Sequence, residues 1–162
     1  MMKKIISALL ALTMVFALVA CGSNGGQSQT EAPDLQAYYD DFMASLGDNA
    51  PMMMAIEGDM LESAYPGLSD YTLKQSVLQM AGISAVAFEM ALVETESEED
   101  AQAVEEIFQA RVDSQIQGGA MYPATIEAWE NASVLVEGCV VALIVAGEDQ
   151  TAAVDAFTAL FA

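Results

Sequence analysis

Acidic side chains are the residues of this chain best suited to chemistry, because two facing carboxylates can cut a glycosidic bond. Three dense clusters could supply such a pair: Asp40-Asp41, Glu98-Glu99-Asp100 and Glu105-Glu106. Each cluster falls on a predicted helix, either on its solvent side or in its first turn, where the helix dipole favours negative charge. The pattern therefore favours a solvated surface, and a carboxylate-based hydrolase is the least favoured function.

Methionine and aromatic residues form two further candidate sites. Met52-Met53-Met54 and Met60 carry thioethers that could bind a soft metal such as Cu(I), but methionine also fills irregular cores, and the chain has no histidine. Tyr122-Pro123 and Trp129 could form an aromatic platform for a sugar or a peptide, although they more often anchor a short helix to a sheet. We therefore expect no catalytic, cofactor-binding or metal-binding residues, and no enzyme.

Charge separates the partners that this chain can bind from those that it cannot. All 24 acidic residues follow Cys21, whereas only Lys74 and Arg111 of the four basic residues do, which gives that part a formal charge of −22. Nucleic acid and anionic lipid headgroups both need clustered Lys and Arg and are excluded. The acidity favours a solvated, repulsive surface, with attraction of cations or basic partners as the alternative. We expect Arg111 to form a partly shielded ion pair with a nearby carboxylate.

A targeting pattern occupies the N-terminus. Lys3 and Lys4 precede an uncharged apolar run, residues 5–18, which is too short for a comfortable membrane span. Small residues then lead to Cys21, and a polar, glycine-rich stretch follows it. This pattern resembles a bacterial lipoprotein signal more than a plain membrane anchor or an ordinary cleaved secretory peptide. The resemblance implies cleavage between Ala20 and Cys21 and a diacylglyceryl thioether on the Cys21 sulfur.

These features divide the chain into three parts. Residues 1–20 are predicted to be a signal peptide that is removed, and residues 21–33 to be the lipidated cysteine and a flexible tether with a reach of about 20 Å. Residues 34–162 are long enough for one domain with its own core. Because two or three acyl chains hold a protein stably, we expect attachment to the extracytoplasmic face of the cell membrane through Cys21.

Hydrophobic periodicity predicts five helices and four strands after the tether. Helical spacing of apolar residues, with Asp34 as an N-cap and Gly47 as a stop, indicates the first helix. Alternation of large apolar residues with small or polar ones indicates the strand around Phe88. The predicted helices span 34–46, 51–64 and 97–118, with a short one from Pro123 and another after Asp149; the predicted strands span the second half of 71–80, 84–94, 133–137 and 139–146.

This order predicts an α+β domain. An antiparallel sheet of about four strands, covered by helices on one face and preceded by N-terminal helices, would bury every apolar stripe. The last two strands are predicted to form a hairpin around Glu137-Gly138. The second half of the chain reads as two β-β-α units, which could be an internal duplication.

Four segments carry a resemblance to a known family: Pro66-Gly67-Leu68, Ala87-Phe88-Glu89, residues 104–111, and Tyr122-Pro123 followed by the hairpin and terminal helix. Residues 65–161 resemble small lipoproteins of anaerobic Gram-positive gut Firmicutes, catalogued as a domain of unknown function. The family brings no established activity, so the resemblance implies only architecture and surface location. We expect a membrane-anchored, non-enzymatic binding or accessory domain with an unidentified envelope partner; the alternative is a lipoprotein that binds a small ligand or a cation.

Overall fold

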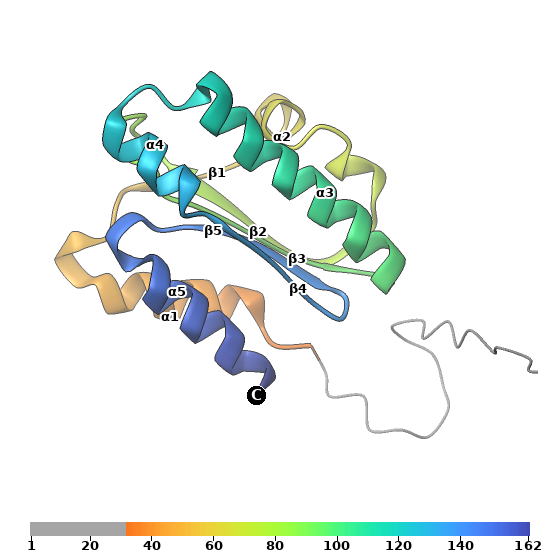
Figure 1. The fold of residues 1–162 in the computed structure, drawn as a ribbon. Helices are drawn as coiled ribbons and strands as arrows, with labels where there is room; N and C mark the ends of the chain where they lie inside the picture. Colours follow the sequence, from red (N-terminus) through yellow and green to blue (C-terminus); the bar gives the residue numbers. More distant parts are fainter. Residues whose placement is uncertain (1–31) are drawn as a thin grey trace, which may run out of the picture.

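The computed structural model describes residues 32–162, so the predicted signal peptide, Cys21 and most of the predicted tether lie outside the described residues. The described chain forms a five-stranded antiparallel sheet in the order β1-β2-β3-β5-β4, with helices packed against it (Figure 1). The α+β class is therefore confirmed. In chain order the elements are α1 (Leu35–Leu46), β1 (Met53–Ala55), α2 (Asp59–Ala64), β2 (Leu73–Ala81), β3 (Glu89–Thr95), α3 (Glu98–Ser114), α4 (Pro123–Glu130), β4 (Ser133–Glu137), β5 (Val140–Val145) and α5 (Gln150–Thr158).

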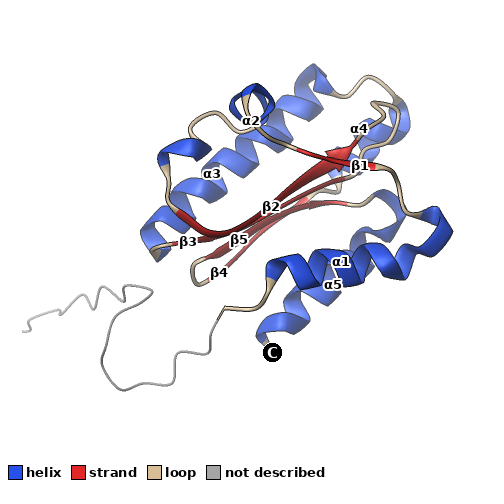
Figure 2. Cartoon of the chain, turned by 180° about the vertical axis from the view of Figure 1, so that it is seen from behind, coloured by secondary structure: helices blue, strands red, loops and turns tan. Residues whose placement is uncertain are grey.

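Helices cover both faces of the sheet, and not one face as the sequence predicts. Along β3, Met90 and Leu92 join a core with α1 and α5, whereas Ala91 and Val93 join a second core with α3. Figure 2 shows α1 and α5 on one side of the sheet and α2, α3 and α4 on the other. The physical reason lies in the central strands: every residue of β5 is buried, so both of its faces need cover.

The segment predicted as one helix over 51–64 is a strand followed by a short helix. Met53–Ala55 is β1, which pairs antiparallel with the end of β2, with Met53 opposite Ala81. Gly58 then adopts a φ of +54°, which a continuous helix cannot contain, and α2 begins at the next residue. Pairing with a sheet edge overrides the local helical pattern, and it adds the fifth strand.

The strand predicted from Ser84 begins five residues later, at Glu89. Residues 82–88 instead form the connection between β2 and β3, in which the Val86 amide donates a hydrogen bond to the carbonyl of Ile83. The preceding strand, β2, spans Leu73–Ala81 and is therefore longer than predicted. Large and small side chains alternate in this connection as they would in a strand, which is why the sequence predicts the strand too early.

The predicted hairpin of the last two strands is confirmed. Glu137 pairs with Val140, so Gly138 and Cys139 form a two-residue turn. Gly138 has a φ of +61°, a conformation that glycine adopts without a Cβ penalty. The backbone amide and the hydroxyl of Thr95 both donate to the carbonyl of Cys139, which ties the turn to the end of β3.

The two β-β-α units, which the sequence left open as a possible duplication, are not arranged symmetrically. The hairpins β2-β3 and β4-β5 meet through the antiparallel pair of β3 and β5. A rotation that exchanges these two strands within one sheet would leave the helices that follow them on the same face. Helices α3 and α5 instead belong to opposite cores, so the two β-β-α units are not related by such a symmetry.

Candidate binding site at one pole of the sheet

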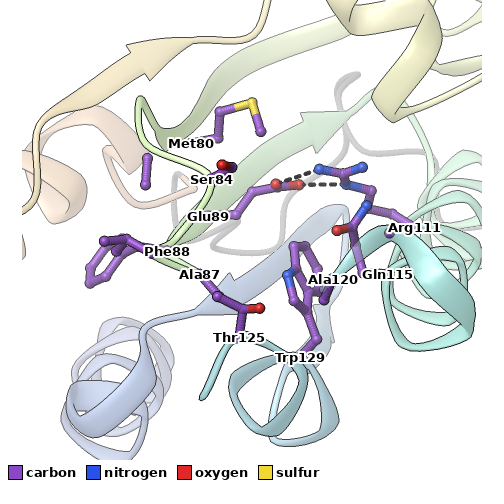
Figure 3. A pocket seen from close by; sticks show the side chains of 13 residues that line it. Met80, Ser84, Ala87, Phe88, Glu89, Arg111, Gln115, Ala120, Thr125 and Trp129 are labelled. Atoms are coloured by element: carbon purple, nitrogen blue, oxygen red, sulfur yellow. Dashed lines mark hydrogen bonds and ion pairs between the residues drawn. The ribbon is translucent and has the colours of Figure 1, made fainter. Parts of the chain in front are cut away.

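A pocket of about 200 Å³ lies at the end of the sheet where β2 ends and β3 begins. It is lined by the end of β2, the β2–β3 connection, the first residue of β3, the last turn of α3, the α3–α4 connection and α4 (Figure 3). Its walls include apolar side chains such as Met80, Val86 and Ala87, and its polar groups include those of Glu89 and Arg111. The arrangement is an apolar hollow above a charged pair.

Glu89 lies at the centre of this pair and is only 1% exposed. Its carboxylate accepts two hydrogen bonds from Arg111, from Nε to Oε1 at 2.9 Å and from Nη2 to Oε2 at 2.7 Å. The hydroxyl of Tyr65 donates to Oε1 at 2.6 Å. A buried carboxylate is costly unless it is paired and hydrogen-bonded, and these three bonds meet that requirement.

Local structure places the partners of Glu89. Arg111 lies in the last turn of α3, which begins at the N-cap Ser97. Tyr65 follows α2, and its ring packs against that of Phe108 with the centroids 5.2 Å apart. The guanidinium of Arg111 also lies 5.3 Å from the ring centroid of Trp129, a cation–π distance. The ion pair therefore links β3 to α3, and its contacts with Tyr65 and Trp129 connect it to the end of α2 and to α4.

The surroundings of Tyr65 and Arg111 shift the pKa values of both side chains. The pKa of Tyr65 is raised well above 10 by burial, by the negative charge of Glu89 and by the hydrogen bond to it, so the phenol stays neutral. Burial works to lower the pKa of Arg111, but the hydrogen bonds and charge of Glu89 outweigh this, and the pKa is raised. Arg111 therefore remains a cation, and it neutralises the floor of the pocket.

This geometry suits binding better than proton transfer. Both oxygens of Glu89 already accept a hydrogen bond from the Arg111 guanidinium, which cannot give up its proton. Arg111 keeps three of its five N–H groups outside the two bonds to Glu89, so it can donate to an acceptor that enters the pocket. The floor can therefore hold a hydrogen-bonding group that carries no net charge.

Most of the large apolar side chains that are exposed in the described chain lie at the same end of the sheet as this pocket. Of the eight large apolar residues that are exposed in the described chain, seven lie in or beside the loops at this pole, and the eighth is Leu160 near the C-terminus. We call these seven residues the rim: Met52, Met54, Ile83, Val86, Ile116, Met121 and Tyr122.

One shared residue and the chain positions of three others relate the rim to the pocket. Val86 is itself a wall of the pocket, and Ile116 and Met121 each follow a lining residue in the sequence. On the other side, the amide of Gly82 donates a hydrogen bond to the carbonyl of Met52 at 2.9 Å, which holds the start of β1 beside the β2–β3 connection. The rim therefore belongs to one end of the molecule.

The chain enters the domain at the opposite pole. The Gln75 side chain accepts a hydrogen bond from the amide of Leu35 and donates one to the carbonyl of Pro33. Gln75 pairs with Glu94, whereas the pocket residue Met80 pairs with Glu89, five residues farther along the ladder, or about 17 Å. Figure 1 shows the start of α1 at one end of the sheet and α4 at the other.

Of the other predicted site residues, Trp129 lines this pocket, whereas the acidic clusters, Met52-Met53-Met54 with Met60, and Tyr122-Pro123 do not. The acidic clusters are on α1 and α3, where every member is exposed except the partly buried Asp100, whose amide donates to Ser97 Oγ at the N-terminus of α3. No group of three His, Cys, Asp or Glu side chains among residues 32–162 is placed to hold a metal ion. Trp129 is 4% exposed and faces Arg111, so it anchors α4 and is not a platform.

Of the two members of the ion pair, the sequence predicts Arg111 but not Glu89. The expected partly shielded ion pair of Arg111 is confirmed. Its partner Glu89 appears in the sequence only as one polar position on the small face of a predicted strand. The usable signal is its place between Phe88 and Met90: a carboxylate within an apolar strand needs a buried partner, and Arg111 is the only arginine.

The fold and site define a small α+β domain with a pocket at one pole, and comparison with known proteins places it in a family. Residues 45–146 match the family described as Domain of unknown function (DUF4358). The match covers more than half of the chain, so this protein belongs to that family, in agreement with the expected membership of an uncharacterised domain family. No curated protein and no solved structure matches the chain.

Proposed function

We propose that this chain is a lipid-anchored, extracytoplasmic, non-enzymatic domain that docks a partner protein through the rim. The single observation that carries the proposal is the separation of the two poles. The chain enters the domain beside Gln75, and seven of the eight exposed large apolar residues of the described part lie at the other end, where the pocket is. An anchor at Cys21 would therefore leave the rim on the far side of the domain.

Large exposed apolar residues that cluster together mark interaction sites on monomeric domains, whereas single ones need no explanation. Met52 and Met121 are 70% and 74% exposed, which is unfavourable in water unless a partner covers them. Methionine is also a flexible side chain that adapts to a partner surface. The composition of the rim is therefore that of a docking surface.

The alternative of a small-ligand or cation-binding lipoprotein has weaker support. Pockets for small molecules usually have volumes of about 300–1,000 Å³, and this one is smaller. Its size suits one side chain of a larger partner.

The proposed membrane attachment lies outside the described residues. Among residues 32–162, no helix combines the length and the apolar character that crossing a membrane requires. The lipobox pattern that ends at Cys21 supplies the proposed attachment, with a single thioether as the covalent link. Two or more acyl chains would make it stable.

Metabolic labelling tests the anchor. Cells that produce the full chain are fed an alkyne fatty acid, and membranes and supernatant are separated. We expect the label on the wild-type protein in the membrane fraction and its loss in Cys21→Ser. Label that persists in Cys21→Ser contradicts the proposal, as does a wild-type N-terminal peptide whose Cys21 sulfur carries no glyceride, including one joined to Cys139 by a disulfide.

A further inference from the structure

The rim and its pocket have a charge environment that narrows the class of partner. Residues 32–162 contain Lys74 and Arg111 as their only basic side chains, and both lie in ion pairs, with Glu94 and Glu89 respectively. Twenty-three acidic residues share the same part of the chain. The described domain therefore presents a strongly negative field, with both of its cations already compensated.

Acidic side chains lie next to the rim as well as elsewhere. Asp48, Glu57 and Asp113 are exposed, and each is within four residues of a rim residue in the sequence. Acids flanking an apolar surface favour partners of opposite charge and disfavour negative ones, because complementary potentials select the partner and speed its approach. The partner surface should therefore be basic around an apolar centre.

The pocket adds a requirement for the centre of the contact. Its floor is the neutral pair of Glu89 and Arg111, and its walls include Val86 and Ala87. A cation placed there would face the guanidinium, and an anion would face both Glu89 and the field of the domain. The group that enters should therefore be uncharged, as buried anchor residues of interfaces usually are.

We propose that the rim docks a protein segment that inserts one uncharged, mainly apolar side chain into the pocket and surrounds it with lysine or arginine. This inference rests on the proposed docking function and gives its partner a chemistry. A second copy of this chain does not fit, because two strongly acidic domains would repel each other. An anionic membrane surface is disfavoured for the same reason.

Synthetic peptides test this partner chemistry without the lipid anchor. The protein is residues 21–162 with Cys21→Ser, which keep the whole described domain. The probes are an amphipathic leucine–lysine peptide, a leucine–glutamate peptide with the same apolar pattern, and a serine–lysine peptide with the same charge. Calorimetric titration should show the leucine–lysine peptide binding at one site per domain, at least tenfold more tightly than either of the other two.

Matched variants locate the binding surface. We expect Val86→Ser combined with Met121→Ser to weaken the leucine–lysine peptide at least tenfold, and Leu160→Ser to leave its affinity unchanged. None of these variants alters charge, so a difference between them reports the apolar rim and not the field. Circular dichroism and thermal melts verify that each variant is folded.

Three results would overturn the inference. Equal affinity in the double rim variant and in Leu160→Ser would show that the rim is not the docking surface. Equal binding of the leucine–glutamate peptide would show that charge does not select the partner. Concentration-dependent dimers that the rim substitutions abolish would show that a second copy covers the rim. None of these results bears on the lipid at Cys21, which the labelling experiment tests separately.

Discussion

Arg111, in the last turn of α3, donates two hydrogen bonds to Glu89, the first residue of β3, at 2.9 and 2.7 Å. The Glu89 carboxylate is almost completely buried, and the Arg111 side chain is 12% exposed. This pair closes the floor of the pocket and holds the end of α3 against the sheet. The connection from α3 to α4, which carries part of the rim, begins one turn later.

Replacing Arg111 alone should destabilise the folded protein more than replacing both members of the ion pair. We expect Arg111→Met to lower the free energy of unfolding by about 3–5 kcal/mol, because it leaves the Glu89 carboxylate buried without a countercharge. The double variant Glu89→Met with Arg111→Met should recover most of that loss, because apolar side chains of similar size can replace a buried pair. Urea unfolding of the single and double variants gives the comparison.

Lys74→Met is the matched control for this cycle, since it also removes one positive charge from an ion pair. The Lys74 ammonium lies 3.6 Å from the Glu94 carboxylate, and the Lys74 side chain is 35% exposed. We therefore expect Lys74→Met to lower the free energy of unfolding by less than about 1 kcal/mol. Similar losses for Arg111→Met and Lys74→Met would mean that the Glu89 pair behaves as a surface pair.

The turn of the last hairpin provides a second test. Gly138 has a φ of +61°, so Gly138→Val should lower the free energy of unfolding by about 1–3 kcal/mol through backbone strain. Gly138→Asn should cost less, because asparagine tolerates this conformation better than other residues. No heavy atom lies within 4 Å of a Cβ built there, so crowding does not account for the loss. An unchanged urea midpoint for Gly138→Val would contradict this reading of the turn.

The pKa of Tyr65 predicts a loss of stability at alkaline pH. The folded protein holds the pKa of the phenol well above 10, its ordinary value, mainly through burial. Above about pH 10 the unfolded chain releases a proton that the folded protein retains, so the free energy of unfolding falls as pH rises. Tyr65→Phe should make that fall shallower, as measured by urea unfolding between pH 9 and 11, roughly one unit either side of the ordinary tyrosine pKa. An equal slope in both proteins would contradict the assignment.

The acidic surface predicts that salt stabilises the domain. Repulsion between carboxylates should be screened at physiological ionic strength, where the Debye length is about 8 Å, and persist at 0.01 M, where it is about 30 Å. Melting temperatures should therefore rise with sodium chloride. Calcium at matched ionic strength should add nothing further. A saturable calcium-specific rise would indicate a cation site and favour the ligand-binding alternative.

Local sequence signals predict the elements that depend on local chemistry. Gly138 in a turn and Asp34 as the N-cap of α1 both have the predicted roles. The paired strand β1 and the second helical layer were missed, because both depend on long-range contacts: Met53 becomes a strand residue only where it meets Ala81. The periodicity of one segment does not show which distant segment will pair or pack with it.

The candidate site likewise combines a part that the local sequence predicts with a part that depends on long-range contacts. Arg111 could be assigned to an ion pair because it is the only arginine, but the choice of Glu89 from 24 acids needs the register of β3 against the last turn of α3. Met52, Met54 and Tyr122 of the rim already stand out in the sequence as candidate binding groups, but their place at one end of the sheet with the other rim residues could not be foreseen. Val86 lies in a segment that alternates like a strand, and it is exposed because the strand starts after it.

Site-specific photo-crosslinking in native membranes tests the central claim most directly. A photoreactive amino acid is placed at Val86 or Met121 on the rim, or at Leu160 and Gln102, which are exposed away from it. The account predicts that both rim positions yield the same crosslinked protein, which the other two positions do not capture, and that the leucine–lysine peptide competes for it. Equal capture at all four positions, or capture only at Leu160 or Gln102, would contradict the account.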